Sequence, residues 1–222
     1  MSKKTKSKAL NLRKRMDTTD KMTDKKYNLT LGSVLSFGLI INCLICLFFT
    51  EQIIQINPLI LCISSLIAVI ASIIIMAFSN NTFVILTGYT ILSASIGSLV
   101  ACSVSYFETD VVFKAIITTT ILVIFMTLIS YINPKFFLSL GKTLLLSLIA
   151  IIIINILFLL ITGTVPTFVS FISVIIFALF IGYDWQKAQT APKTFKNAII
   201  SAGELYLDII NIFLNLLELF DN

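Results

Sequence analysis

The sequence contains no histidine, and charged residues make up only 12% of its 222 positions. Without histidine, the commonest general base and the zinc sites that depend on imidazole are excluded, and metalloprotease chemistry with them. Glycine is scarce as well, and its eight copies form neither a dinucleotide-binding nor a phosphate-binding loop. The sequence therefore shows no nucleotide site that could drive a pump, and it predicts no resident cofactor.

Hydrophobic residues dominate instead, at 58% of the chain. A soluble domain is about a quarter charged, so this composition needs lipid as its solvent. Apolar runs close to the roughly 20 residues that cross a bilayer as a helix recur along the chain. We therefore predict an all-α, polytopic membrane protein with seven transmembrane helices. The expected spans are 29–50, 58–78, 83–107, 111–131, 143–162, 165–183 and 198–220.

Only four cysteines are present, and all of them lie inside apolar segments. Cys43 and Cys46 have the spacing of a redox pair. At lipid depth, however, cysteine usually behaves as a small hydrophobic residue. We therefore interpret the cysteines as structural.

The positive charge of the chain is concentrated in its first 28 residues. They carry ten Lys or Arg against three Asp, a net charge of +7, whereas the whole chain has +5. A basic arm could suit nucleic acid, but beside a membrane span it is better interpreted as facing the cytoplasm and anionic lipid, so no nucleic acid is expected as a partner. We predict a disordered tail over 1–28 that is dispensable for folding, and a transmembrane domain over 29–222.

The remaining cations indicate the orientation of the helices, because short cytoplasmic loops collect Lys and Arg. Lysines occupy the fourth and sixth loops, while the first and third loops carry Glu51, Glu108 and Asp110. Lys114, which follows the third loop, is an exception to this pattern. This pattern predicts a cytoplasmic N-terminus and, after seven spans, a C-terminus outside.

The last apolar segment carries a polar stripe. Its polar residues are spaced four, three, four and three apart, which places them on one face of a helix. A charged group at membrane depth costs about 3 kcal/mol, so acidic residues there are functional candidates. We expect this helix at the centre of the bundle with the stripe turned inward, although the asparagines could instead only join helices. The stripe consists of Glu204, Asp208, Asn211, Asn215 and Glu218.

A further carboxylate, Asp184, ends the sixth predicted segment. Alone it could be an interfacial residue in an aromatic belt. If it meets Asp208, the two carboxylates cannot both ionise cheaply in a poorly solvated site and will share one proton. Such a pair would respond to pH without histidine.

Two strings in this region resemble the Bax inhibitor-1 family, also called the transmembrane Bax inhibitor motif family. The first is Gly182-Tyr183-Asp184-Trp185-Gln186, which is similar to the family's tyrosine-aspartate motif. The second runs from Leu205-Tyr206-Leu207-Asp208 to Leu217 and is long and specific. The resemblance implies a seven-helix bundle with the last helix central. It also implies similarity to the family's bacterial pH-sensitive calcium leak channels, and with it a place in the bacterial plasma (inner) membrane.

By this resemblance, Asp184 and Asp208 form the pH-sensing pair that gates the pore and are possible calcium contacts. Glu204, Asn211, Asn215 and Glu218 become pore-lining candidates. The family's calcium-leak members also latch the pair with an arginine near the end of the second helix. Here no Lys or Arg lies between Lys26 and Lys114, and Asn80 and Asn81 stand near the expected position.

We therefore predict a non-enzymatic, passive cation leak, because the stripe offers the carboxylate and amide oxygens that hard divalent cations prefer, and the resemblance implies that calcium is the ion. Two alternatives remain open. The chain could bind an FtsH-type membrane protease or restrain cell death, as some relatives do. It could also be an intramembrane aspartyl protease, since such enzymes place paired aspartates on their sixth and seventh helices. Their glycine-x-glycine-aspartate motif is replaced here by Leu205-Tyr206-Leu207-Asp208.

Overall fold

The computed structural model describes residues 21–221 of the chain. The described part is helical and contains no strand, and seven of its helices are long and apolar enough to cross a membrane. The predicted fold class, an all-α polytopic bundle, is confirmed. The helices are α2 (Asp24–Phe48), α3 (Thr50–Ile53), α4 (Pro58–Phe78), α5 (Thr82–Val104), α6 (Thr109–Ile132), α7 (Pro134–Ser139), α8 (Gly141–Thr162), α9 (Thr167–Thr190) and α10 (Phe195–Asp221).

Short polar residues begin several of these helices. The Asn57 side chain accepts a hydrogen bond from Leu59 N (2.9 Å), and Pro58 occupies the first turn of α4, where its missing N–H costs nothing. The Asn81 side chain caps α5 in the same way, through Phe83 N (2.9 Å). At its far end, α8 stops at Gly163, whose φ of 75° favours glycine. Local sequence thus determines where the helices begin and end. Between the ends the chain is helical because backbone N–H and C=O groups in lipid must be hydrogen-bonded within the segment.

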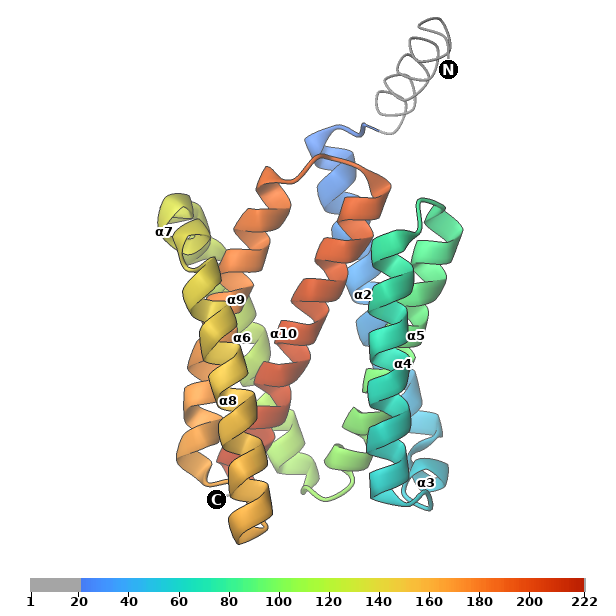
Figure 1. The fold of residues 1–222 in the computed structure, drawn as a ribbon, viewed down its shortest axis with the longest axis vertical. Helices are drawn as coiled ribbons and strands as arrows, with labels where there is room; N and C mark the ends of the chain where they lie inside the picture. Colours follow the sequence, from blue (N-terminus) through green and yellow to red (C-terminus); the bar gives the residue numbers. More distant parts are fainter. Residues whose placement is uncertain (1–20, 222) are drawn as a thin grey trace, which may run out of the picture.

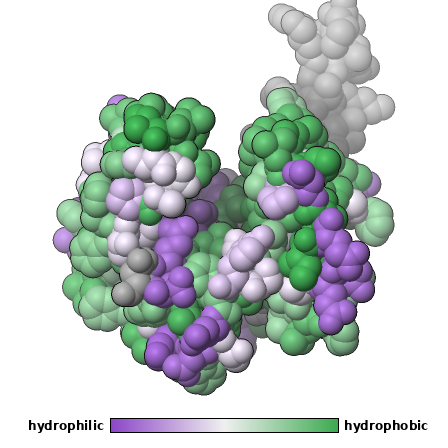
Figure 2. Space-filling view, turned by 90° about the horizontal axis from the view of Figure 1, so that it is seen from below, coloured by the Kyte–Doolittle hydropathy of each residue, from purple (hydrophilic) through white to green (hydrophobic). Residues whose placement is uncertain are grey.

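Helix α10 lies at the centre of the bundle, between α2, α4 and α5 on one side and α6, α8 and α9 on the other (Figure 1). It contacts α2, α4, α5, α6 and α9, and it has the largest buried share of the seven spans. The outer helices instead present large hydrophobic side chains outward. Figure 2 shows the molecule from below, with several hydrophilic patches among mostly hydrophobic residues. This arrangement matches a bundle surrounded by lipid.

Two helix boundaries differ from those predicted by five residues or more, and the others by three at most. Helix α2 begins at Asp24, so residues 24–28, which the sequence assigned to the tail, are helical. Helix α9 continues past Asp184 to Thr190, so part of the polar run between Gln186 and Asn197 is helical. A prediction from hydropathy ends each span at the first polar residues, but the helix itself can continue into the polar membrane interface. The prediction of a disordered tail concerns mainly residues outside the described part.

The upper end of the bundle in Figure 1 holds the start of α2, helix α7 and the α9–α10 connection, and the lower end holds α3 and the end of α10. The two ends differ in charge, because most lysines lie above, whereas Glu51, Glu108 and Asp110 lie below, with Lys114 paired to Asp110. One upper lysine joins two helices: Lys196 Nζ, on α10, donates to Ala77 O (2.9 Å) and Ser79 O (2.7 Å) at the end of α4.

Candidate functional site

The polar stripe of α10 faces a cavity between α8, α9 and α10, which we call the central cavity. Its volume is about 490 Å³. All six residues predicted from the sequence line it together, although they come from two helices. These residues are Asp184, Glu204, Asp208, Asn211, Asn215 and Glu218. From Glu204 to Glu218 the stripe extends about 21 Å along the helix axis, roughly two thirds of the hydrocarbon thickness.

Asp184 and Asp208 meet across the α9–α10 contact. Their carboxyl groups lie within hydrogen-bond reach of each other, and the residues are 7% and 6% exposed. Asp208 Oδ2 has no donor among the described residues. A proton held between the two carboxyls would satisfy this buried oxygen, whereas two ionised carboxylates at such a distance would repel strongly. The structure therefore brings the predicted pair together.

A lysine that the sequence analysis assigned to a loop lies beside this pair. Lys187 Nζ is 2.7 Å from Glu204 Oε1 and 3.7 Å from Asp184 Oδ1. It occupies this position because α9 continues for another turn and a half after Asp184, which places Lys187 three residues further on the same face. The run from Tyr183 to Thr190 contains neither Pro nor Gly, and this signal could have extended the predicted helix.

The asparagines predicted near a latch position have a different role. Asn80 and Asn81 lie between α4 and α5, where Asn81 caps α5 and Asn80 Oδ1 accepts from Lys196 Nζ (3.3 Å). Among the described residues, the cation beside the aspartate pair is therefore Lys187, from the same helix as Asp184.

The far end of the central cavity is bordered by Glu218. Ser170 Oγ, on α9, donates to Glu218 Oε2, so α9 and α10 are joined at this end too. Between the two ends, Asn211 Nδ2 and Asn215 Nδ2 each donate to the carbonyl one turn earlier in α10, at 2.7 Å. These amides do not use their donors to join helices, and their carbonyl oxygens remain available to a cation in the cavity.

Tyr206 explains the other half of the leucine-tyrosine-leucine-aspartate string. It points away from the central cavity, accepts a hydrogen bond from Asn42 Nδ2 (3.1 Å) on α2 and donates to Ser93 O (3.3 Å) on α5. The tyrosine is fully buried. Two residues apart on one helix, Tyr206 and Asp208 lie on different faces, so the string anchors α10 on one side and presents a carboxylate on the other.

No group of three or more Cys, Asp or Glu that could hold a metal ion occurs between residues 21 and 221. The calcium contacts expected of Asp184 and Asp208 stay a prediction. What the arrangement offers chemically is a row of oxygen ligands along one wall of a cavity.

Comparison with known families identifies the family of the chain. The family described as inhibitor of apoptosis-promoting Bax1 matches residues 20–222, which include every helix described above. The comparison with curated proteins finds no match.

Proposed function

Since the chain belongs to the Bax inhibitor-1 family, we propose that it is a passive, pH-sensitive cation leak channel and that calcium is its ion. One observation carries this proposal, namely that six oxygen-bearing side chains from α9 and α10 line a single cavity. Soluble cores bury such groups only when they are paired, and in a membrane helix they mark ion or substrate paths.

Calcium is proposed as the ion because the side chains that line the central cavity offer oxygen ligands. The stripe offers carboxylate and amide oxygens, which suit hard divalent cations, and it offers no imidazole. A leak follows the existing gradient and needs no nucleotide or cofactor. We place the protein in the bacterial inner membrane with its N-terminus in the cytoplasm, so the upper end of Figure 1 faces the cytoplasm.

Gating follows from the aspartate pair. With one shared proton, Asp184 and Asp208 hold α9 against α10 through a short, charge-assisted hydrogen bond. Loss of that proton leaves two negative charges in a poorly solvated site, where they repel each other and attract a cation. Leak therefore increases as pH rises.

Calcium uptake into liposomes that contain the pure protein tests the proposal. A trapped dye would follow uptake between about pH 6 and pH 8, the range that brackets a carboxylate pair sharing a proton. We expect uptake above that of empty liposomes, and faster uptake at the higher pH. Uptake equal to that of empty liposomes at every pH would remove the channel proposal and favour a regulatory role, such as binding an FtsH-type membrane protease.

A further inference from the structure

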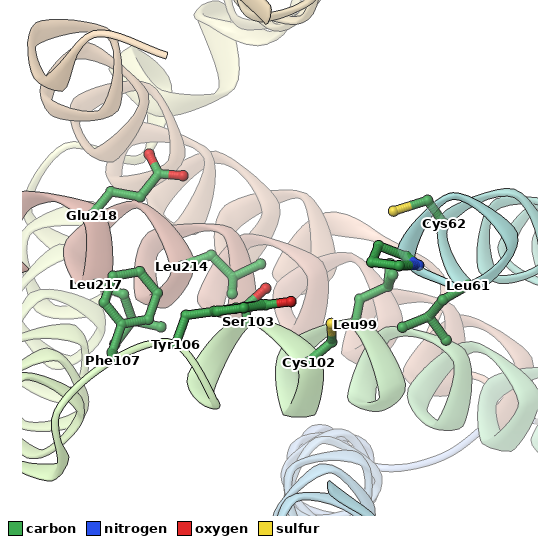
Figure 3. A pocket seen from close by; sticks show the side chains of 11 residues that line it. Leu61, Cys62, Leu99, Cys102, Ser103, Tyr106, Phe107, Leu214, Leu217 and Glu218 are labelled. Carbon is green, nitrogen blue, oxygen red and sulfur yellow. The ribbon is translucent and has the colours of Figure 1, made fainter. Parts of the chain in front are cut away.

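A second cavity lies at the lower end of the bundle, between α4, α5 and α10, and we call it the lower cavity. Its volume is about 300 Å³. Figure 3 shows Glu218 on one side of it and Cys62 on the other, with Leu214, Ser103 and Cys102 between them. Its remaining lining residues are Pro58, Leu61, Leu99, Tyr106, Phe107 and Leu217.

The lower and central cavities share two residues. Leu214 and Glu218 line both of them, and they lie one turn apart on the same face of α10. A cation that leaves the lower cavity past these two side chains therefore reaches Asn215 and Asn211 next, and then the aspartate pair. Leu214 supplies apolar bulk at this junction and Glu218 supplies charge.

The charges at the two ends of the molecule favour the same route. The lower cavity belongs to the end that carries Glu51, Glu108 and Asp110; Asp110 pairs with Lys114 (2.9 Å), and the remaining negative charge concentrates cations. At the opposite end, the central cavity ends at the Lys187–Glu204 ion pair, and further lysines lie at that end of the bundle. The end with more lysines is the less favourable entrance for a cation.

We propose that cations enter through the lower cavity and pass between Leu214 and Glu218, so that Glu218 is the first carboxylate that they meet. This inference rests on the proposed leak and identifies the lower cavity as the entrance of the ion path on the outer side of the membrane. It also gives the lower cavity a selectivity, because a carboxylate at its inner wall attracts cations and repels anions of the same size.

Cysteines of the natural sequence make the lower cavity testable. Cys62 and Cys102 line it, whereas Cys43 and Cys46 lie on α2 outside it. Methanethiosulfonate reagents add a charged group to a thiol, forming a mixed disulfide and releasing sulfinate. Proteoliposomes would be treated on both sides with an ammonium or a sulfonate reagent of similar size, followed by calcium uptake and by mass spectrometry of each cysteine.

We expect the ammonium reagent to modify Cys62 and Cys102 about tenfold faster than the sulfonate reagent, because the cavity attracts cations. Modification should lower calcium uptake several-fold. A Cys43→Ser/Cys46→Ser variant should behave like the natural protein, whereas uptake by a Cys62→Ser/Cys102→Ser variant should resist the reagents. Glu218→Gln should reduce the rate preference for the ammonium reagent and leave both cysteines reactive.

The outcomes separate this inference from the proposed leak. Uptake that is present but unchanged after Cys62 and Cys102 are modified would overturn the route while sparing the channel. Equal modification rates by the two reagents would overturn the selectivity of the mouth. If untreated protein shows no uptake, the leak itself fails. As a second variant, Leu214→Ala should raise uptake several-fold, whereas Leu219→Ala, on α10 but lining neither cavity, should not; equal uptake by both would also contradict the route.

Discussion

Lys187 Nζ lies 2.7 Å from Glu204 Oε1 and 3.7 Å from Asp184 Oδ1, so one ammonium group contacts carboxylates on both helices that form the candidate site. With one proton shared between Asp184 and Asp208, the four groups carry a net charge of about −1. When that proton leaves, the net charge becomes about −2. The lysine therefore sets how much negative charge the cavity holds at a given pH.

We predict that Lys187→Gln moves the pH midpoint of calcium uptake upward, by about one to three pH units. Without the ammonium group, ionisation of the pair leaves more uncompensated negative charge, so the proton is held to higher pH. The measurement is uptake by proteoliposomes across a pH series. Lys142→Gln, which removes an exposed lysine from α8, is the matched control and should leave the midpoint unchanged. A midpoint that is the same in both variants would show that Lys187 does not act on the pair.

The aspartate pair makes a separate prediction. Asp208→Asn keeps the size of the side chain and its hydrogen bonding but abolishes its titration, so the pH response of uptake should become flat. Asp184→Asn should have the same effect, and the double variant should add nothing, because either substitution already removes the shared proton. Asp110→Asn, at an exposed aspartate paired with Lys114 (2.9 Å), is the control. A pH response that survives both single substitutions would assign the sensing to another group.

Tyr206→Phe should destabilise the bundle by about 1–3 kcal/mol, because Asn42 Nδ2 loses its buried acceptor. Thermal unfolding in detergent would measure the loss as a lower Tm. Tyr106→Phe removes a hydroxyl from a side chain that is 72% exposed and should change the Tm very little. Equal Tm values for the two variants would mean that the contact of Tyr206 with α2 does not contribute to stability.

We predict that the tail that is dispensable for folding is shorter than the 28 residues that composition indicates. Thr23 Oγ1 caps α2 through Lys26 N (3.3 Å), and Met22 N donates to Lys193 O (2.8 Å) in the α9–α10 connection. Removing residues 2–20 should leave the Tm unchanged, whereas removing 2–24 should cost about 1 kcal/mol through the lost cap. Loss of folded protein after the shorter truncation would show that the tail supports the bundle.

Topology is the fifth prediction. A reporter that is active only in the cytoplasm should be active when fused to the N-terminus and silent when fused after residue 222, because lysines gather at the upper end of the bundle. A fusion at the α9–α10 connection, which lies at the same end as the start of α2, serves as the positive control. Activity at the C-terminus would mean that one of the seven apolar helices does not cross the membrane.

Much of this molecule could be predicted from its sequence, for physical reasons. A helix that crosses the bilayer needs an apolar run of about 20 residues, so the seven spans and their order can be found in the sequence. A periodic polar stripe identifies the inward face of the last helix. The position of Lys187 could not be predicted in this way, because hydropathy cannot distinguish a polar helical turn from a loop. The contacts of Tyr206 with Asn42 and Ser93 were inaccessible too, since they depend on packing between helices far apart in sequence.

Lys196 fastens α10 to the last turn of α4, while the opposite end of α4 forms a wall of the lower cavity through Leu61 and Cys62. If α4 tilted about this upper contact, its lower end would move most. Over its 21 residues, about 30 Å, a tilt of about 10° would displace the lower end by about 5 Å. The width of the lower cavity would then follow small changes of helix tilt, and with it the thickness of the surrounding bilayer.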